Sequence, residues 1–192
     1  MTRLNDTTQR IVEAAAALFL ARGFGAVSMD QIAACAGITK ITVYQHVRSK
    51  EQLLIDCLRW RLARREVALD AYLSSHPVGC PSVMAIFDWT AANAEAGSFA
   101  GCAFLKATNE MADALPEVRE VAREAKRLIR VRLTSHAAAT GGSDAAVKGQ
   151  VCSLLLEGAQ ALSHVECSSA PFHVARAEAA RLLASNPAKA AR

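Results

Sequence analysis

The sequence contains little of what interrupts helices and little of what builds sheets. Among its 192 residues are only 10 Gly and 5 Pro, and aromatic residues make up 5%. No segment alternates apolar and polar residues in the way that a half-buried strand requires. Alanine, which has the highest helix propensity, is abundant, and 52% of the residues are hydrophobic, enough for a sizeable core. The composition therefore predicts an all-α protein.

The sequence also lacks the patterns of secreted, membrane and metal-binding proteins. Its N-terminal segment, MTRLNDTTQR, is polar, and no run of about 18 apolar residues is present. The cysteines form no CxxC pair, so neither a disulfide framework nor a zinc site is indicated. We therefore expect a cytoplasmic chain with reduced thiols, no membrane contact, no metal and no cofactor. The cysteines are Cys35, Cys57, Cys80, Cys102, Cys152 and Cys167.

Signatures of catalysis are missing as well. There is no glycine-rich phosphate loop, no His-x-x-Glu metal spacing and no Ser, His and Asp in the order of a known triad. The five histidines are scattered along the chain. We therefore do not expect an enzyme, and a helical-bundle enzyme is kept only as an alternative.

Positive charge is concentrated in the first third of the chain. Residues 1–65 contain ten Lys and Arg against five Asp and Glu, whereas the remaining 127 residues contain 12 basic and 13 acidic side chains. This asymmetry predicts that the N-terminal third meets a polyanion, although a solvated cationic face has the same composition.

Start and stop residues predict about nine helices. Ser28, Thr39 and Ser49 are typical N-caps, and Gly23 and Gly37 are typical helix ends. The predicted helices cover about 6–22, 29–36, 40–46, 50–73, 81–95, 102–112, a segment from 116 onwards, 144–165 and 172–184. The first three form a compact tri-helical unit, and the sequence predicts one domain over residues 5–65 and a second helical domain over 66–192.

Residues 28–47 have the pattern of a helix-turn-helix. Ala33 is small where the two helices must touch, Gly37 suits a left-handed turn, and Ile38 and Val43 are apolar where the second helix must be held. The other side chains of the second helix can donate hydrogen bonds or stack, as phosphates and base edges require.

This stretch resembles the helix-turn-helix of the TetR family of bacterial transcriptional regulators. The resemblance is carried by Ile32-Ala33, Ala36-Gly37, Tyr44-x-His46 and Ser49-Lys50-Glu51, together with the Leu-Phe-x-x-Arg-Gly-Phe run before them, and it covers residues 6–60. Two positions depart from the family pattern: Ile41 stands where a small residue or Pro is common, and Val47 where Phe is usual.

The resemblance implies a set of DNA contacts. Tyr44, His46 and Lys50 would contact phosphates, and Thr39, Lys40, Thr42 and Gln45 would contact base edges or adjacent phosphates. The predicted DNA-binding set is Ser28, Thr39, Lys40, Thr42, Tyr44, Gln45, His46 and Lys50. The resemblance further implies a homodimer on a palindromic double-stranded operator, because one recognition helix contacts too few bases for specificity.

The second domain is predicted to dimerise and to sense a small molecule of unknown identity. The last two helices are the predicted dimer interface, and a purely intramolecular core is the alternative. One helix carries an apolar stripe of Val147, Val151, Leu154, Leu155, Gly158 and Leu162, and the other carries a matching stripe of Phe172, Ala179, Leu182 and Leu183. The candidate ligand-binding residues are Trp60, Met84, Phe87, Trp89, Phe104, Asn109, Glu110, Glu157 and His164. The segment 101–110 resembles a part of the family that lies between ligand and DNA-binding domain, which makes it a candidate relay.

The predicted function is a dimeric DNA-binding transcriptional regulator, a repressor that a small-molecule ligand releases from its operator. One alternative is a thiol-based redox-sensing regulator, because Cys35 lies in the helix-turn-helix and Cys57 on the helix that follows it. Lone helical cysteines, however, usually behave as small buried apolar residues.

Overall fold

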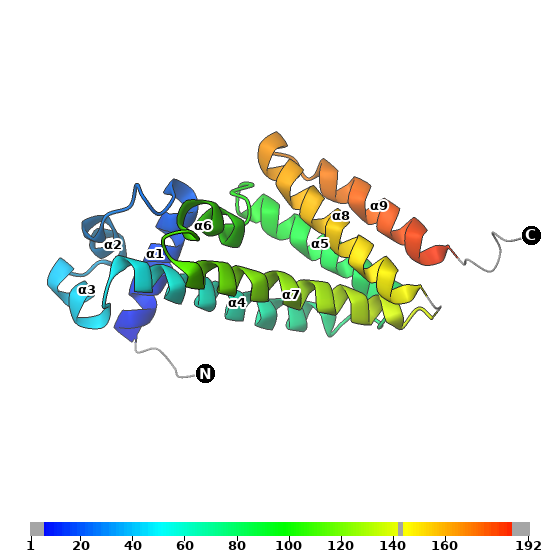
Figure 1. The fold of residues 1–192 in the computed structure, drawn as a ribbon, viewed down its shortest axis with the longest axis horizontal. Helices are drawn as coiled ribbons and strands as arrows, with labels where there is room; N and C mark the ends of the chain where they lie inside the picture. The colour runs from blue at the N-terminus through cyan, green and yellow to red at the C-terminus, as the bar shows by residue number, and fades with distance from the viewer. Residues whose placement is uncertain (1–5, 142–143, 186–192) are drawn as a thin grey trace, which may run out of the picture. The chain divides into compact units, whose positions relative to one another are not determined.

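A computed structural model describes residues 6–141 and 144–185, which form nine helices and contain no strand, so the all-α prediction is confirmed (Figure 1). The helices are α1 (Asp6–Arg22), α2 (Met29–Ala36), α3 (Lys40–His46), α4 (Lys50–Leu73), α5 (Cys80–Ala96), α6 (Ala103–Met111), α7 (Pro116–Ala138), α8 (Ala145–Glu166) and α9 (Ala170–Ala184). None of these helices, within the described ranges, has the length and apolar character that crossing a bilayer needs.

The helices begin and end where short-range sequence patterns place them. Ser28 and Gln31 form a complete capping box at α2, and the Ser49 hydroxyl accepts the Gln52 N–H at 3.0 Å where α4 begins. Gly37 ends α2 with φ 66°, and Gly23 follows α1 with φ 83°, both in the left-handed region that favours glycine.

The described residues form two compact units. Unit 1 contains residues 6–65 and 103–125, and unit 2 contains residues 66–102, 126–141 and 144–185. The predicted domain limits differ, because they assign residues 103–125 to the second domain. Those residues join unit 1 because α6 is bonded to it: Lys106 Nζ donates to the Leu20 carbonyl at 2.7 Å, and Glu110 Oε2 accepts the Phe24 N–H at 2.7 Å. The parts of the predicted domains at residues 5, 142–143 and 186–192 lie outside the described residues.

The core of unit 1 is made by α1 together with the helices that pack against it. Ile11 and Ala15 of α1, Ile32 of α2, Val43 of α3 and Leu53 of α4 have no exposed surface. The N-terminal α1 therefore supplies the surface on which the helix-turn-helix is assembled.

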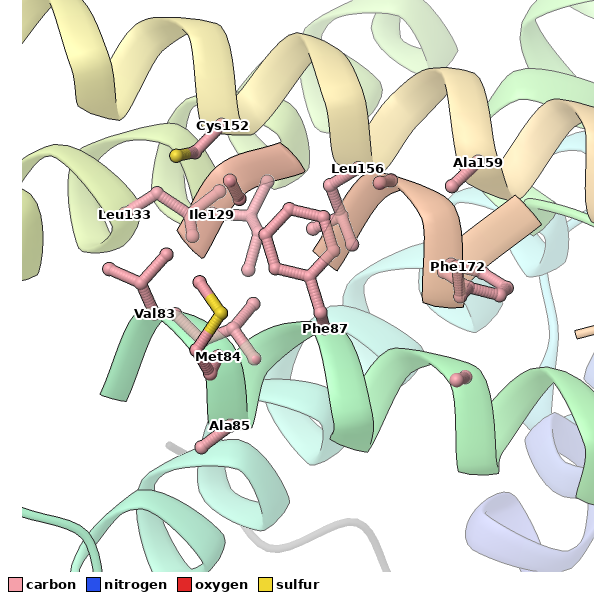
Figure 2. Close-up of a cluster of buried hydrophobic side chains, with 14 of the residues drawn as sticks. Val83, Met84, Ala85, Phe87, Ile129, Leu133, Cys152, Leu156, Ala159 and Phe172 are labelled. Atoms are coloured by element: carbon pink, nitrogen blue, oxygen red, sulfur yellow. The ribbon is translucent and has the colours of Figure 1, made fainter. Parts of the chain in front are cut away.

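Unit 2 is built around α5, which packs against α8 and α9. Every residue from Ser82 to Phe87 is buried, so this helix is enclosed on all sides over those positions. Figure 2 shows the ring of Phe87 rising from α5 towards α8, with Leu156 of α8 and Phe172 of α9 in the same cluster. α8 and α9 are joined by a short connection and run side by side (Figure 1).

Candidate nucleic-acid interface

The second helix of the helix-turn-helix, α3, is held in place by local bonds and one buried anchor. Thr39 caps it by accepting the Thr42 N–H at 3.1 Å, and Val43, with no exposed surface, fixes its inner side. The turn before it is bonded to α1, because Arg10 Nη2 donates to the Ala36 carbonyl at 2.6 Å. Arg10 was not singled out from the sequence, since nothing local indicates a partner 26 residues away.

The outward face of α3 combines polar, aromatic and apolar side chains. Lys40 and Gln45 are exposed, Tyr44 is 52% exposed and Ile41 is 74% exposed. Residues four apart lie one turn apart on a helix, so Lys40 neighbours Tyr44, and Ile41 neighbours Gln45. Four side chains from a seven-residue helix thus form one exposed surface.

Several of the predicted DNA-binding side chains also hold the motif together. The hydroxyls of Thr39 and Thr42 lie 2.8 Å apart and are used at the start of α3, while the Ser28 hydroxyl caps α2. His46 Nδ1 lies 3.0 Å from Thr8 Oγ1 of α1. Part of the hydrogen-bonding capacity of these four residues is therefore already used within the protein. Their role as DNA contacts stays a prediction.

The cations of this surface are placed by neighbours of different kinds. Lys40 Nζ forms an exposed ion pair with Asp30 at 2.9 Å, and this hydrogen bond and charge raise the pKa of Lys40 above its usual value. Lys50, the first residue of α4, lies 4.2 Å above the ring of Phe24. Arg48, exposed between α3 and α4, was absent from the predicted set; its charge next to Ser49-Lys50 is the signal that could have included it.

The candidate ligand-binding residues divide between the units. Trp60, Phe104, Asn109 and Glu110 belong to unit 1, whereas Met84, Phe87, Trp89, Glu157 and His164 belong to unit 2.

In unit 1 these residues have partners within the unit or lie at its surface. The ring of Phe104 is buried, with the Arg65 guanidinium 5.6 Å from its centroid. Trp60 stacks with Arg64 at 4.9 Å, and Asn109 is exposed. Glu110 is one of the residues lining a hollow with room for about one water molecule, too small for an organic effector.

In unit 2 the structure brings Met84 and Phe87 together as buried core, with Trp89 packed against the same cluster. Glu157 accepts a hydrogen bond from Lys126 at 2.5 Å, and His164 Nδ1 lies 2.5 Å from the Phe99 carbonyl. The two polar residues therefore have separate partners. A groove beside Glu157 is lined by Lys126, Arg130, Gln150, Ser153, Leu154 and Glu157.

Only part of the predicted dimer interface is available on the surface. Val147, Leu154 and Leu162 are exposed along α8. The predicted stripe on α9 is wrong as an interface, because Phe172, Ala179 and Leu183 are buried in the core of unit 2 and the partly buried Leu182 packs against that core. A helix at the edge of a bundle turns its apolar side inwards.

Small residues of α8 are likewise used inside the chain. At Gly149 an added Cβ would come within 2.5 Å of the Thr134 Cα of α7, so this glycine permits close helix packing. Cys152 and Ala159 belong to the buried cluster. The face that remains open is the one on which Gly158 has no neighbour within 4 Å.

The cysteines have different environments. Cys57 and Cys152 are buried, and burial raises the pKa of the Cys57 thiol far above its usual value and that of Cys152 to about 11. Both thiols are therefore poor nucleophiles at neutral pH. Cys35 and Cys167 are exposed.

Comparisons with known proteins agree with this geometry. The family model described as bacterial regulatory proteins, tetR family, matches residues 11–57. The chain is 38% identical over 70 residues to the transposon Tn10 TetC protein of Escherichia coli, an alignment covering 36% of this chain and 34% of that protein. It is 43% identical over 49 residues to the HTH-type transcriptional regulator SrpR of Pseudomonas putida, covering 26% and 23%. The chain thus matches a minor part of the length of these curated relatives.

The likeness extends over the whole fold in solved structures. The crystal structure of a TetR-family transcriptional regulator from Streptomyces coelicolor superposes with a TM-score of 0.80 at 25% identity, over 93% of this chain and 96% of that chain. The helix-turn-helix sequence therefore matches the tetR family over residues 11–57, and the helices of the chain have the fold of a TetR-family regulator.

Proposed function

We propose that this chain is a transcriptional repressor that binds a palindromic operator as a homodimer and is released from it by a small molecule. The observation that carries the proposal is the exposed face of α3, with Lys40, Tyr44 and Gln45 around Ile41. A helix with such a face fits the major groove, where amide and cationic side chains bond base edges and phosphates.

Charge supports the same assignment. The helix-turn-helix lies in the third of the sequence that carries the excess of basic residues, and Arg48 and Lys50 flank the connection from α3 to α4. Cations that neutralise phosphates release counterions from DNA, which gives affinity that falls steeply with salt concentration. The proposal therefore predicts salt-sensitive binding to duplex DNA.

The exposed row on α8 supports a dimer. Val147, Leu154, Leu162 and Val165 recur at the spacing of one helix face, and Leu154 is 73% exposed. A contiguous apolar row of this kind is typical of a protein interface. A second copy supplies an identical row, and two-fold pairing would place one α3 on each half of a palindrome.

The attachment of α6 to α1 supports a route for release. Lys106 bonds a carbonyl at the C-terminal end of α1, and Glu110 bonds the backbone just after it. An effector that binds more tightly to a state in which α6 has moved would also move the end of α1, and it would shift the population away from the DNA-binding state. A coupling of about 1–3 kcal/mol is typical of such effects.

The DNA assignment is tested with duplexes that the full chain recovers from random-sequence and genomic libraries. Tyr44→Ala and Lys50→Ala should weaken binding to every duplex, measured by fluorescence anisotropy. Lys50→Ala, which removes a cation, should also lower the salt slope by about one. Arg181→Ala, which removes an exposed charge from α9, is the matched control and should leave the slope unchanged. Equal affinities for all four proteins would contradict the assignment.

The dimer and the release are tested separately. In analytical ultracentrifugation, wild type should sediment as a dimer and Leu154→Glu as a monomer with weaker operator binding. The control Val67→Glu changes a residue that is also exposed but lies on α4, and it should leave the dimer intact. Genes next to recovered operators indicate candidate effectors, and an effector should lower the anisotropy of the bound duplex. A wild-type monomer in solution would refute the interface, and full operator affinity at saturating concentrations of every bound compound would refute the release.

A further inference from the structure

The outward face of α3 contains one side chain that its polar surroundings do not explain. Ile41 is 74% exposed, the most exposed large apolar residue of the helix-turn-helix. It has no packing role there, because the neighbouring Val43 is the residue that anchors α3 to the core. An isoleucine held in water at this position is apolar surface that a bound partner could cover.

The polar side chains around Ile41 are mostly engaged within unit 1. Lys40 is paired with Asp30, the Thr39 and Thr42 hydroxyls are bonded to each other, and His46 is bonded to Thr8. Gln45 is exposed one turn beyond Ile41, and no side-chain hydrogen bond of Gln45 occurs within the described part of the chain. Ile41 and Gln45 are therefore the neighbouring side chains of α3 that are most available for contact with a partner.

The chemistry of this pair matches one kind of base pair. In the major groove the 5-methyl group of thymine is the apolar group that a base edge presents, and an amide side chain bonds adenine at N6 and N7 together. Side chains one turn apart on a helix are separated by about 5–6 Å, and adjacent base pairs by about 3.4 Å. An isoleucine and a glutamine in this arrangement suit a thymine and an adenine in the same or the next base pair.

We infer that Ile41 contacts the 5-methyl group of a thymine in each half-site and so selects A·T over other pairs beside the base bonded by Gln45. The inference rests on the proposed DNA-binding function and names part of its specificity. Contact between the isoleucine and the methyl group removes apolar surface of both from water, which is favourable without any hydrogen bond.

The test uses duplexes that the full wild-type chain selects from a random-sequence library. Each thymine of the half-site is replaced, one at a time, by deoxyuridine, which removes only the methyl group. Wild type should lose about fourfold in affinity at one position, which corresponds to about 0.8 kcal/mol for a single buried carbon group. Ile41→Ala should bind the thymine and deoxyuridine duplexes equally at that position.

Two controls make the result specific. Gln45→Ala should keep the fourfold methyl effect while it loses preference for adenine at the adjoining position. Thermal unfolding of Ile41→Ala should match wild type, because the side chain is exposed.

The outcomes separate this inference from the function on which it rests. If no deoxyuridine position weakens wild type, or if the same loss persists in Ile41→Ala, the methyl contact is overturned while selective duplex binding stands. If the wild-type chain enriches no duplex and shows no salt-sensitive affinity, the proposed function and the inference both fail.

Discussion

The outward face of α3 in unit 1 differs from the charged cluster around Arg132 in unit 2 in how its polar side chains are used. In unit 1, α3 exposes Tyr44, Gln45 and Lys40 on one face. In unit 2, charged groups are bonded to each other: Arg132 pairs with Glu66 at 2.7 Å and with Asp70. Burial alone would lower the pKa of Arg132, but the hydrogen bonds and charges of Asp70 and Glu66 together raise it. The face of α3 thus keeps side chains such as Tyr44 and Gln45 at the surface, whereas the charged groups around Arg132 hold helices of unit 2 together.

The apolar residues differ in a parallel way. The helix-turn-helix is anchored by a few small or medium side chains and leaves an isoleucine in water. Unit 2 instead buries whole aromatic rings, among them Phe87 and Phe172, in a core to which α4, α5, α7, α8 and α9 contribute. A surface that binds a rigid partner needs little more than correct orientation, while a bundle derives its stability from large-scale burial.

The largest expected effect tests whether Phe87 is core or ligand-pocket wall. Phe87→Ala should lower the free energy of unfolding by about 3–5 kcal/mol, because it leaves a cavity between α5 and its neighbours, and urea unfolding followed by circular dichroism measures it. Val174→Ala, exposed on α9, should change it by less than about 0.5 kcal/mol. A loss for Phe87→Ala as small as that of the control would return this residue to the candidate ligand pocket.

A smaller effect tests the assignment of α6 to unit 1. Glu110→Ala removes a charged acceptor from the Phe24 N–H and should cost about 2 kcal/mol, with faster amide exchange at the start of the α1–α2 connection. Its neighbour Asn109 is exposed, so Asn109→Ala should have little effect on either measurement. If both variants behave alike, α6 does not stabilise unit 1 through Glu110.

These differences explain what the sequence could and could not predict. Caps and turns act over three or four residues, so Ser28, Gly37 and Thr39 correctly placed the helices of unit 1 before any tertiary contact was known. The exposed face of α3 could also be predicted from neighbouring residues. When one side of a seven-residue helix is anchored in the core, its opposite side is exposed to solvent.

Contacts between distant residues could not be predicted in this way. The α9 stripe has the same apolar spacing whether it faces its own bundle or a second copy, and only the packing of α5 and α8 against it decides. Likewise, nothing near Glu110 in the sequence indicates that its carboxylate accepts the N–H of Phe24, 86 residues away.

A third prediction concerns the caps on which that short-range order depends. Ser28→Ala should cost about 1 kcal/mol, because it removes the acceptor for the Gln31 N–H and half of the capping box. Ser28→Asp keeps an acceptor and should restore stability in thermal unfolding. A DNA contact by the Ser28 hydroxyl would be revealed if Ser28→Asp folds normally but binds duplex more weakly than wild type.

The smallest effect concerns a titratable group of unit 2. His136 of α7 has a buried Nδ1 without a hydrogen-bond partner in the described part of the chain, and burial together with the charge of Arg132 lowers its pKa.

Because the folded state takes up this proton less readily than the unfolded state, unfolding binds a proton below the unfolded pKa of about 6.5. The free energy of unfolding should therefore decrease as the pH falls from about 7 towards 5, and urea unfolding at several pH values should show a shallower decrease in His136→Gln. The exposed neighbour Ser135 offers a control, since Ser135→Ala should keep the wild-type slope. If the free energy of unfolding depends on pH in the same way in all three proteins, His136 is not shielded from solvent by the packing of unit 2. The contrast between the enclosed polar groups of unit 2 and the exposed face of α3 would then be weaker.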